Sequence, residues 1–345
     1  MSECIDKVCR RETLGREGAR VAMDRLVSGE VSEVQAAALL GALGARGADE
    51  EELIGFALSL REHALKVEIR GRALVDTCGT GGDGLHTFNF STAAALVAAG
   101  AGAAVAKHGN RAVSSRSGSV EVLEALGVVA DAPPESVRRS IEQTGFGFLF
   151  APRFHPAMRN VAPVRRALRV RTVFNLLGPL ANPAGVKRQV VGVYDAALVP
   201  VIARVLAGLG AARAMVVHGE DGMDELSLAS ATHVAHVDAV RGIWTETLVP
   251  GDAGLRPAGA AALRGGGPAE NARHLEELLL GRSGPLADGA SLNAGAALVV
   301  AGIAATVREG VALARESIMS GRAHEVLVKL RREAHGTTTR EEIAS

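Results

Sequence analysis

The sequence predicts an α/β protein in which a small helical N-terminal domain precedes a larger domain with a mostly parallel central sheet. Three features of the chain predict this fold. Residues 14–72 carry helix signals only, residues 73–218 alternate short apolar strands with helices, and a glycine-rich loop follows the first of those strands. Strands that alternate with helices are typical of parallel sheets, whose ligands bind at the carboxyl ends of the strands. We expect the helical domain to span 1–72 and the α/β domain to span 73–345.

The helical region contains two recognisable helix starts. Ser32 and Gln35 form a capping-box pattern ahead of an Ala/Leu run, and Asp49 and Glu52 form a second such pattern. Apolar residues follow the second start at helical spacing. No strand is predicted before Ala73.

The region after Ala73 carries the strand signals. We predict strands at 73–76, 103–106, 146–150, 189–194 and 213–218. Between them we predict helices at 92–101, 119–126 and 134–144. The last helix begins after Pro133 and ends at Gly145, as proline favours helix starts and glycine favours helix ends.

Charge and composition argue against several classes of protein. Lys and Arg together number 38, as do Asp and Glu, so no net charge favours nucleic acid or an anionic membrane. Three cysteines without a CxxC pair predict neither a disulfide framework nor zinc, which indicates a reducing compartment. The N-terminus has no signal-peptide core, and no apolar run reaches the roughly 20 residues of a membrane span. We therefore expect no nucleic-acid partner, no membrane partner and a cytoplasmic location.

The glycine-rich segment CGTGGDG at 78–84 follows the first predicted strand. Consecutive glycines let backbone N–H groups converge on an anion. The segment matches the dinucleotide fingerprint GxGxxG, but no helix opens at its third glycine, and the next strand ends in Lys107 instead of an acidic residue. It is not a P-loop, because no Gly-Lys-Ser/Thr follows. We interpret it as a loop that binds a phosphorylated small molecule; a turn without a ligand is the alternative. Cys78 has no basic neighbour before it, and we assign it no chemistry.

Two further segments, each ahead of a predicted helix, carry anion-binding groups. Residues 87–92 (TFNFST) place hydroxyls and an amide ahead of an Ala-rich helix, where they either cap the helix or hold phosphate or a metal. Residues 107–119 combine Lys, Arg and several serines ahead of the next helix. A solvated basic loop is the alternative for this second segment.

An acidic segment, EDGMDE at 220–225, follows the strand predicted at 213–218. Adjacent carboxylates at a strand end suit Mg²⁺ that carries a pyrophosphate, since this ion prefers oxygen ligands and retains waters. An exposed acidic turn is the alternative.

Seven motifs in this order make the chain similar to a known family. They are DTCGTGGDG at 76–84, NFST at 89–92, KHGNR at 107–111, HPAM at 155–158, PVR at 163–165, RT at 171–172 and NLLGPL at 175–180. The series resembles the anthranilate phosphoribosyltransferase family, from the helical N-terminal region to about residue 330. The resemblance implies the fold of the nucleoside phosphorylases and phosphoribosyltransferases. It also implies a homodimer that associates through the helical domain, joined by a segment near 165–185.

The implied reaction joins anthranilate to 5-phosphoribosyl 1-pyrophosphate (PRPP), giving N-(5-phosphoribosyl)anthranilate and pyrophosphate in tryptophan biosynthesis. The residues implied to bind PRPP are Gly79, Gly82, Asp83, Thr87, Asn89, Phe90, Ser91, Thr92, Lys107, His108, Gly109, Asn110, Arg111, Ala112, Val113, Ser114, Ser115 and Ser119. Those implied to contact anthranilate are Gly79, Asn110 and Arg165, with Arg165 facing the carboxylate. Those implied to hold Mg²⁺ are Ser91, Asp224 and Glu225.

We predict Lys107 and Asp83 as catalytic residues. Lys107, magnesium and the loop amides would neutralise the negative charge that grows on departing pyrophosphate. We assign no general base, because the attacking amine loses its proton readily once bonded; His108 is either a helper or structural. The sequence departs from the family at Phe90, where an aliphatic residue is expected, and at Arg169, where Gly is more common.

Two other functions remain open. A pyrimidine nucleoside phosphorylase would share the fold and a glycine-rich phosphate loop, but it would not need the Asp224–Glu225 pair, and its loop departs from GTGGDG. A nucleic-acid-binding relative that has lost catalysis would carry a basic face and degraded acidic residues. The balanced charge and the intact acidic pair favour the transferase.

Overall fold

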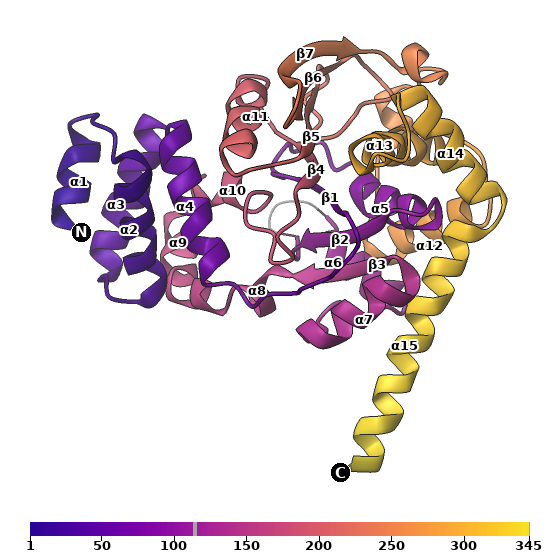
Figure 1. Cartoon of the computed structure of the whole chain (residues 1–345), viewed down its shortest axis with the longest axis horizontal. Helices are drawn as coiled ribbons and strands as arrows, with labels where there is room; N and C mark the ends of the chain where they lie inside the picture. The colour runs from indigo at the N-terminus through magenta and orange to yellow at the C-terminus, as the bar shows by residue number, and fades with distance from the viewer. Residues whose placement is uncertain (113–115, 345) are drawn as a thin grey trace.

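A computed structural model describes residues 1–112 and 116–344 of the chain. Its N-terminal part is a bundle of helices that lies at one end of the molecule (Figure 1). These helices are α1 (Ser2–Cys9), α2 (Gly15–Ser28), α3 (Glu33–Arg46) and α4 (Glu50–Glu62). Both predicted helix starts are confirmed: the Ser32 hydroxyl accepts a hydrogen bond from the Gln35 amide, and Asp49 and Glu52 form a complete capping box. Helix α1 was not predicted.

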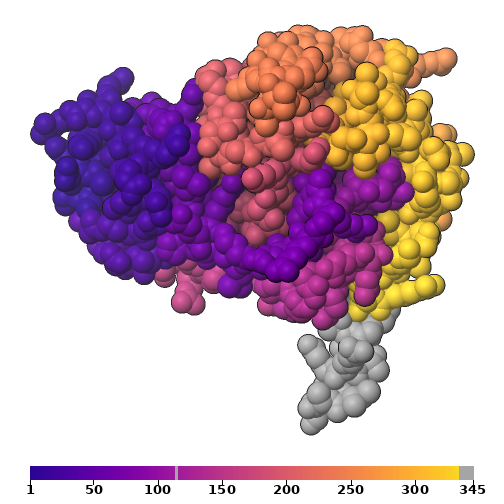
Figure 2. Space-filling model, viewed as in Figure 1, coloured from indigo at the N-terminus to yellow at the C-terminus, as the bar shows by residue number. Residues whose placement is uncertain are grey.

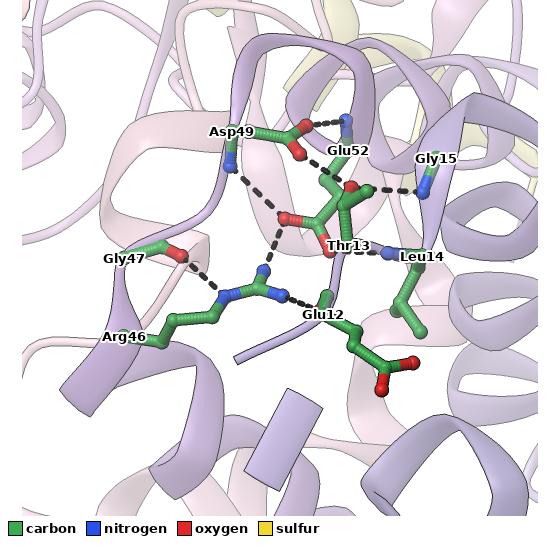
Figure 3. Close-up of polar contacts among 8 residues, drawn as sticks. All are labelled: Glu12, Thr13, Leu14, Gly15, Arg46, Gly47, Asp49 and Glu52. Carbon is green, nitrogen blue, oxygen red and sulfur yellow. Dashed lines mark hydrogen bonds and ion pairs between the residues drawn. The ribbon is translucent and has the colours of Figure 1, made fainter. Parts of the chain in front are cut away.

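A buried carboxylate joins the loops at one end of this bundle (Figure 3). The Glu52 side chain is fully buried and accepts hydrogen bonds from the backbone amides of Leu14, at 2.9 Å, and Asp49, at 3.0 Å. The Arg46 guanidinium donates to the same carboxylate and to two backbone carbonyls. Glu52 therefore ties the start of α2, the end of α3 and the start of α4 together.

The central sheet has the strand order β3-β2-β1-β4-β5-β6-β7 among the described residues. Its strands are β1 (Leu74–Gly79), β2 (Ala104–Gly109), β3 (Phe146–Phe150), β4 (Arg188–Gly192), β5 (Arg213–Gly219), β6 (Thr232–Asp238) and β7 (Gly242–Leu248). Strands β1 to β5 are parallel, and β6 and β7 add an antiparallel hairpin. The predicted mostly parallel sheet is confirmed, and each predicted strand overlaps an observed one.

Strands β6 and β7 were not predicted. Strand β7 forms an edge of the sheet and exposes all but its last residue, so it carries no apolar alternation to detect. Strand β6 mixes buried residues with half-buried polar ones. A strand whose side chains are exposed on both faces of the sheet needs no alternation of apolar and polar residues.

Helices cover both faces of the sheet. The longer ones are α5 (Phe90–Gly100), α6 (Ser119–Ala125), α7 (Pro134–Thr144), α11 (Leu198–Gly208), α12 (Pro268–Leu279), α13 (Pro285–Ala301), α14 (Val307–Met319) and α15 (Arg322–Ala344). Alternate strand residues face opposite cores: Val190 and Val217 pack with α5 and α13, whereas Val191 and Val216 pack with α11 and the bundle. Helix α7 has the predicted bounds and ends at Gly145, whose φ is 80°.

The bundle shares its core with a later segment of the chain. Helices α9 (Ala162–Leu168) and α10 (Phe174–Leu177) pack against α3 and α4, and short helix α8 (Ala151–Phe154) precedes them. In the space-filling view the N-terminal helices lie at one end and the chain's later helices at the other (Figure 2). Arg169 ends α9 with φ 52° and ψ 25°, a left-handed conformation that glycine favours. Arg169 therefore occupies a backbone conformation that a glycine would adopt more readily.

None of the helices in the described part of the chain is long and apolar enough to cross a membrane.

Candidate active site

A cavity of about 380 Å³ opens at the carboxyl ends of β1 and β2, next to the bundle. The predicted site residues that line it are Gly79, Gly82, Asp83, Thr87, Asn89, Ser91, Lys107, His108, Gly109, Asn110, Arg111, Ala112, Ser119, Arg165, Asp224 and Glu225. Val113, Ser114 and Ser115 lie outside the described residues. Segments far apart in the sequence therefore meet at the carboxyl ends of the strands, where parallel α/β folds bind their ligands.

Two predicted PRPP contacts, Phe90 and Thr92, lie behind the cavity wall. Phe90 is 1% exposed, and its ring packs edge-on against Phe88, with the centroids 5.2 Å apart. Thr92 is fully buried. A Cβ atom added at Gly289 would lie 2.5 Å from the Phe90 ring, so the glycine in α13 makes room for this aromatic residue. Phe90 thus fills the core beneath the site.

Paired glycines make room for Asp224 against the sheet. Gly79 and Gly192 are neighbours in β1 and β4. A Cβ atom would lie 2.2 Å from the Asp224 carboxylate at Gly79 and 1.5 Å from the Asp224 carbonyl at Gly192. The Gly81 amide donates to Asp224 Oδ2 at 2.7 Å. The glycine loop and the acidic segment therefore form one unit. Gly192 was not predicted as a site residue.

The acidic segment is not an exposed turn. Asp224 and Glu225 are half-buried at the cavity wall, where Glu225 Oε1 accepts a hydrogen bond from the Ser91 amide at 2.9 Å. Burial, followed by the charge of Asp83, raises the pKa of Asp224 to about 6. Burial and the charge of Asp224 raise the pKa of Glu225 well above its usual range. Two carboxylates packed this way favour a nearby cation.

These residues fit a magnesium ion that is shared with a substrate. Glu225 Oε2 is buried and has no hydrogen-bond partner in the described part of the chain. No group of three Asp, Glu, His or Cys side chains forms a ready-made metal site among the described residues. Mg²⁺ usually binds one or two carboxylates, keeps several waters and takes its other ligands from substrate phosphates. The pair with the nearby Ser91 hydroxyl matches that pattern.

Lys107 lies at the base of the cavity and is 1% exposed. Its ammonium donates to the Thr77 carbonyl, and burial lowers its pKa while the charge of Asp76 opposes that shift. Asp76 is fully buried and accepts hydrogen bonds from Asn182, at 2.8 Å, and from the His108 amide, at 3.2 Å. Lys107 therefore lies beneath the cavity with its ammonium already bonded to a backbone carbonyl. Asp76 and Asn182 were missed as supports, although a carboxylate inside an apolar strand signals a buried partner.

The two arginines predicted in the site differ in their surroundings. The Arg165 guanidinium is partly buried and lies 4.9 Å from the Phe174 ring centroid, and burial lowers its pKa. The Arg111 guanidinium instead makes paired hydrogen bonds, of 2.9 and 2.6 Å, with Glu124. Because Glu124 already balances Arg111, Arg165 is the cation more available to a ligand anion.

His108, at the end of β2, lines the cavity. Its Nδ1 lies 3.0 Å from the Gly178 carbonyl, so this nitrogen carries the proton. Burial lowers the pKa of His108 to about 3, and the ring is neutral near pH 7. Phe174, Asn175 and Pro179 line the cavity as well. They lie in or beside the NLLGPL motif, for which no substrate contact was predicted.

Comparisons with known proteins agree with this architecture. A family model described as "Glycosyl transferase family, helical bundle domain" matches residues 2–64, and "Glycosyl transferase family, a/b domain" matches residues 71–324. The chain is 52% identical to the anthranilate phosphoribosyltransferase of Anaeromyxobacter dehalogenans (strain 2CP-C) over 330 residues, which cover 96% of this chain and 97% of the relative.

Solved structures show the same similarity. The crystal structure of anthranilate phosphoribosyltransferase from Thermus thermophilus has a TM-score of 0.90 and 50% identity, covering 96% of this chain and 99% of that one. The Saccharomyces cerevisiae enzyme in complex with PRPP and Mg has a TM-score of 0.89 and 29% identity, covering 97% and 98%. The chain belongs to this glycosyl transferase family, and within it to the anthranilate phosphoribosyltransferases.

Proposed function

We propose that this chain transfers the phosphoribosyl group of PRPP to the amine of anthranilate, giving N-(5-phosphoribosyl)anthranilate and pyrophosphate in tryptophan biosynthesis. The observation that carries this function is the convergence of the glycine loop, the Asp224–Glu225 pair and Arg165 on one cavity. Each supplies a feature that one part of the reaction needs: amides for phosphate, carboxylates for a phosphate-bound cation, and a guanidinium for a carboxylate.

PRPP binds along the glycine loop and the Lys107–Ser119 segment in this proposal. Loop amides and the hydroxyls of Thr87 and Ser91 donate to phosphate oxygens. Ser91, Asp224 and Glu225 would hold Mg²⁺; the yeast relative's complex with PRPP and Mg supports a role for the ion itself. When bound, Mg²⁺ neutralises charge on the leaving pyrophosphate.

The chain's own residues orient the reactants and favour charge separation. Lys107 places a positive charge under the cavity, and the loop amides favour negative charge on the departing pyrophosphate. Asp83 faces the same cavity from the glycine loop and contributes to its acidic wall. Anthranilate binds against Gly79, Asn110 and Arg165, with its carboxylate on Arg165. Because His108 is neutral, it does not donate a proton to the amine of anthranilate, and the site only has to position that amine.

The domain assignment and assembly are part of the same proposal. Residues 1–72 form the helical domain, with 165–185 packed beside it, and residues 73–345 form the catalytic domain. The helical domain and the 165–185 segment form the contact of a homodimer, and the enzyme works in the cytoplasm. The packing of α9 and α10 on α3 and α4 supports the placement of 165–185 beside the helical domain, because the two share one core.

A substrate panel tests the reaction class. Purified protein should consume anthranilate, followed by its fluorescence, only when PRPP and Mg²⁺ are both present. A pyrimidine nucleoside phosphorylase would instead consume thymidine or uridine with inorganic phosphate and leave anthranilate untouched. Retention on heparin at physiological salt without turnover would favour the nucleic-acid-binding alternative.

Arg165→Ala should raise the Michaelis constant for anthranilate by about ten- to a hundredfold, since a charge-assisted hydrogen bond contributes roughly 1.5–3 kcal/mol. The Michaelis constant for PRPP should change little. Steady-state kinetics with each substrate varied in turn measures both values. Arg166→Ala is the matched control, because Arg166 is the exposed neighbour of Arg165 on α9. Normal anthranilate binding in Arg165→Ala would show that another cation faces the carboxylate.

A further inference from the structure

We infer that Arg171 is a positioning residue that fixes the glycine loop from outside the cavity and so sets its affinity for PRPP. The inference rests on the proposed function and extends it to a residue that does not line the cavity in the described part of the chain. Arg171 lies in the connection between α9 and α10, beside the helical bundle. It acts on substrate only through the loop.

The Arg171 guanidinium makes two contacts with the catalytic domain. It lies 4.0 Å from the centroid of the Tyr194 ring, which is close enough for a cation–π interaction. Its Nη2 donates a hydrogen bond to the Gly82 carbonyl. The backbone of Arg171 packs on the bundle as well, since a Cβ atom added at Gly44 in α3 would lie 3.3 Å from the Arg171 carbonyl. One side chain therefore links the bundle to the glycine loop.

This contact sets the orientation of one loop peptide. The carbonyl of Gly82 and the amide of Asp83 belong to the same planar trans peptide, so they point in opposite directions. The carbonyl faces Arg171, outside the cavity, while Gly82 and Asp83 both line it. The Asp83 N–H is therefore turned to the cavity side, where it can donate to a phosphate oxygen. A peptide flip would replace this donor with a carbonyl that repels phosphate.

Arg171 and Tyr194 add restraints to a glycine-rich loop that is otherwise held through Thr80 and Gly81. Gly81, Gly82 and Gly84 have φ values of 66°, 82° and 72°, and glycine readily leaves such conformations for others. Tyr194 is joined to the loop too, because its amide donates to the Thr80 hydroxyl at 3.2 Å. The Arg171 side chain and the Tyr194 backbone therefore hold the loop at two points, and part of the ordering cost is met before PRPP binds.

The same contacts separate Arg171 from the anthranilate end of the cavity. Its guanidinium is engaged by the Gly82 carbonyl and the Tyr194 ring, whereas Arg165 lines the cavity itself. The two arginines should therefore affect different substrates. A rise in the Michaelis constant for PRPP alone is a result that a general loss of structure would not produce.

The test compares Michaelis constants for both substrates in Arg171→Ala, Arg171→Lys, Tyr194→Ala and the Arg171→Ala, Tyr194→Ala double variant. Arg171→Ala should raise the Michaelis constant for PRPP about tenfold, because a less restrained loop must be ordered when PRPP binds. The constant for anthranilate should stay within about twofold. Arg171→Lys keeps a donor and a cation and should recover most of the PRPP affinity. The double variant should be no worse than Arg171→Ala, since both residues restrain one loop.

Arg166→Ala, a nearby exposed arginine change, serves as the control and should behave as wild type. A wild-type PRPP constant in Arg171→Ala, or a rise in the anthranilate constant instead, would overturn the inference. If Arg171→Ala lowers the melting temperature, Tyr194→Leu provides the second test, because Tyr194 is half-buried. Tyr194→Leu should raise the Michaelis constant for PRPP and leave that for anthranilate unchanged. An unchanged Michaelis constant for PRPP overturns the inference. Inactive wild-type protein would instead refute the proposed function, so the two failures are distinguishable.

Discussion

Replacing Asp224 with Asn and Glu225 with Gln in one variant should lower turnover by about a hundredfold or more while the protein still folds. The amides keep the shape of both side chains but remove the charge that would hold a metal against pyrophosphate. Folding should survive, because these carboxylates are crowded together and burial raises the pKa of each. Turnover across a magnesium titration, with the melting temperature of the metal-free protein, measures both effects.

Glu220→Gln provides the matched control for this variant. Glu220 belongs to the same acidic segment but is exposed, and its carboxylate lies 3.6 Å from the His233 ring. It should keep the wild-type magnesium curve. If the Asp224→Asn, Glu225→Gln variant also kept that curve and most of its rate, the pair would not be part of a metal site.

Glu52→Gln should lower the free energy of unfolding by about 3–5 kcal/mol, the largest stability effect that we expect. The change leaves the Arg46 guanidinium, which is only 13% exposed, without its counter-charge, and uncompensated buried charges are costly. It also replaces an acceptor of two backbone N–H groups, from Leu14 and Asp49, with an amide that offers one oxygen (Figure 3). Denaturant unfolding monitored by circular dichroism measures the difference.

The adjacent residue supplies the comparison. Glu51 pairs with Arg16 at 2.8 Å, but both side chains are about half exposed, and surface pairs of this kind contribute under about 1 kcal/mol. Glu51→Gln should therefore be nearly neutral. Equal destabilisation by the two variants would show that burial of Glu52 does not set its contribution.

The sequence predicted the parts of the fold that local chemistry determines. The capping box at Asp49, the bounds of α7 and the parallel strands all follow from residue patterns within short windows. The glycine loop and the acidic segment could be placed at strand ends, and the sheet then brings them together. The pairing of Gly79 with Gly192 around Asp224 could not be predicted, because it depends on strand register.

The direction in which each side chain points also could not be predicted from the sequence. Residues 87–92 form one polar motif, yet Phe90 and Thr92 turn into the core, because the helix that starts there presents successive residues to different sides. Arg111 and Arg165 look alike in sequence, but Glu124 balances only Arg111. Such differences depend on neighbours that are distant in the chain.

The ratio of pyrophosphate released to anthranilate consumed tests the central claim most directly. With PRPP and Mg²⁺ present, we expect one pyrophosphate for each anthranilate, and no pyrophosphate when anthranilate is omitted, because the cavity would favour transfer to a bound amine over hydrolysis. Equal pyrophosphate release with and without anthranilate, or consumption of neither substrate, would contradict the account of this cavity as a phosphoribosyl transfer site.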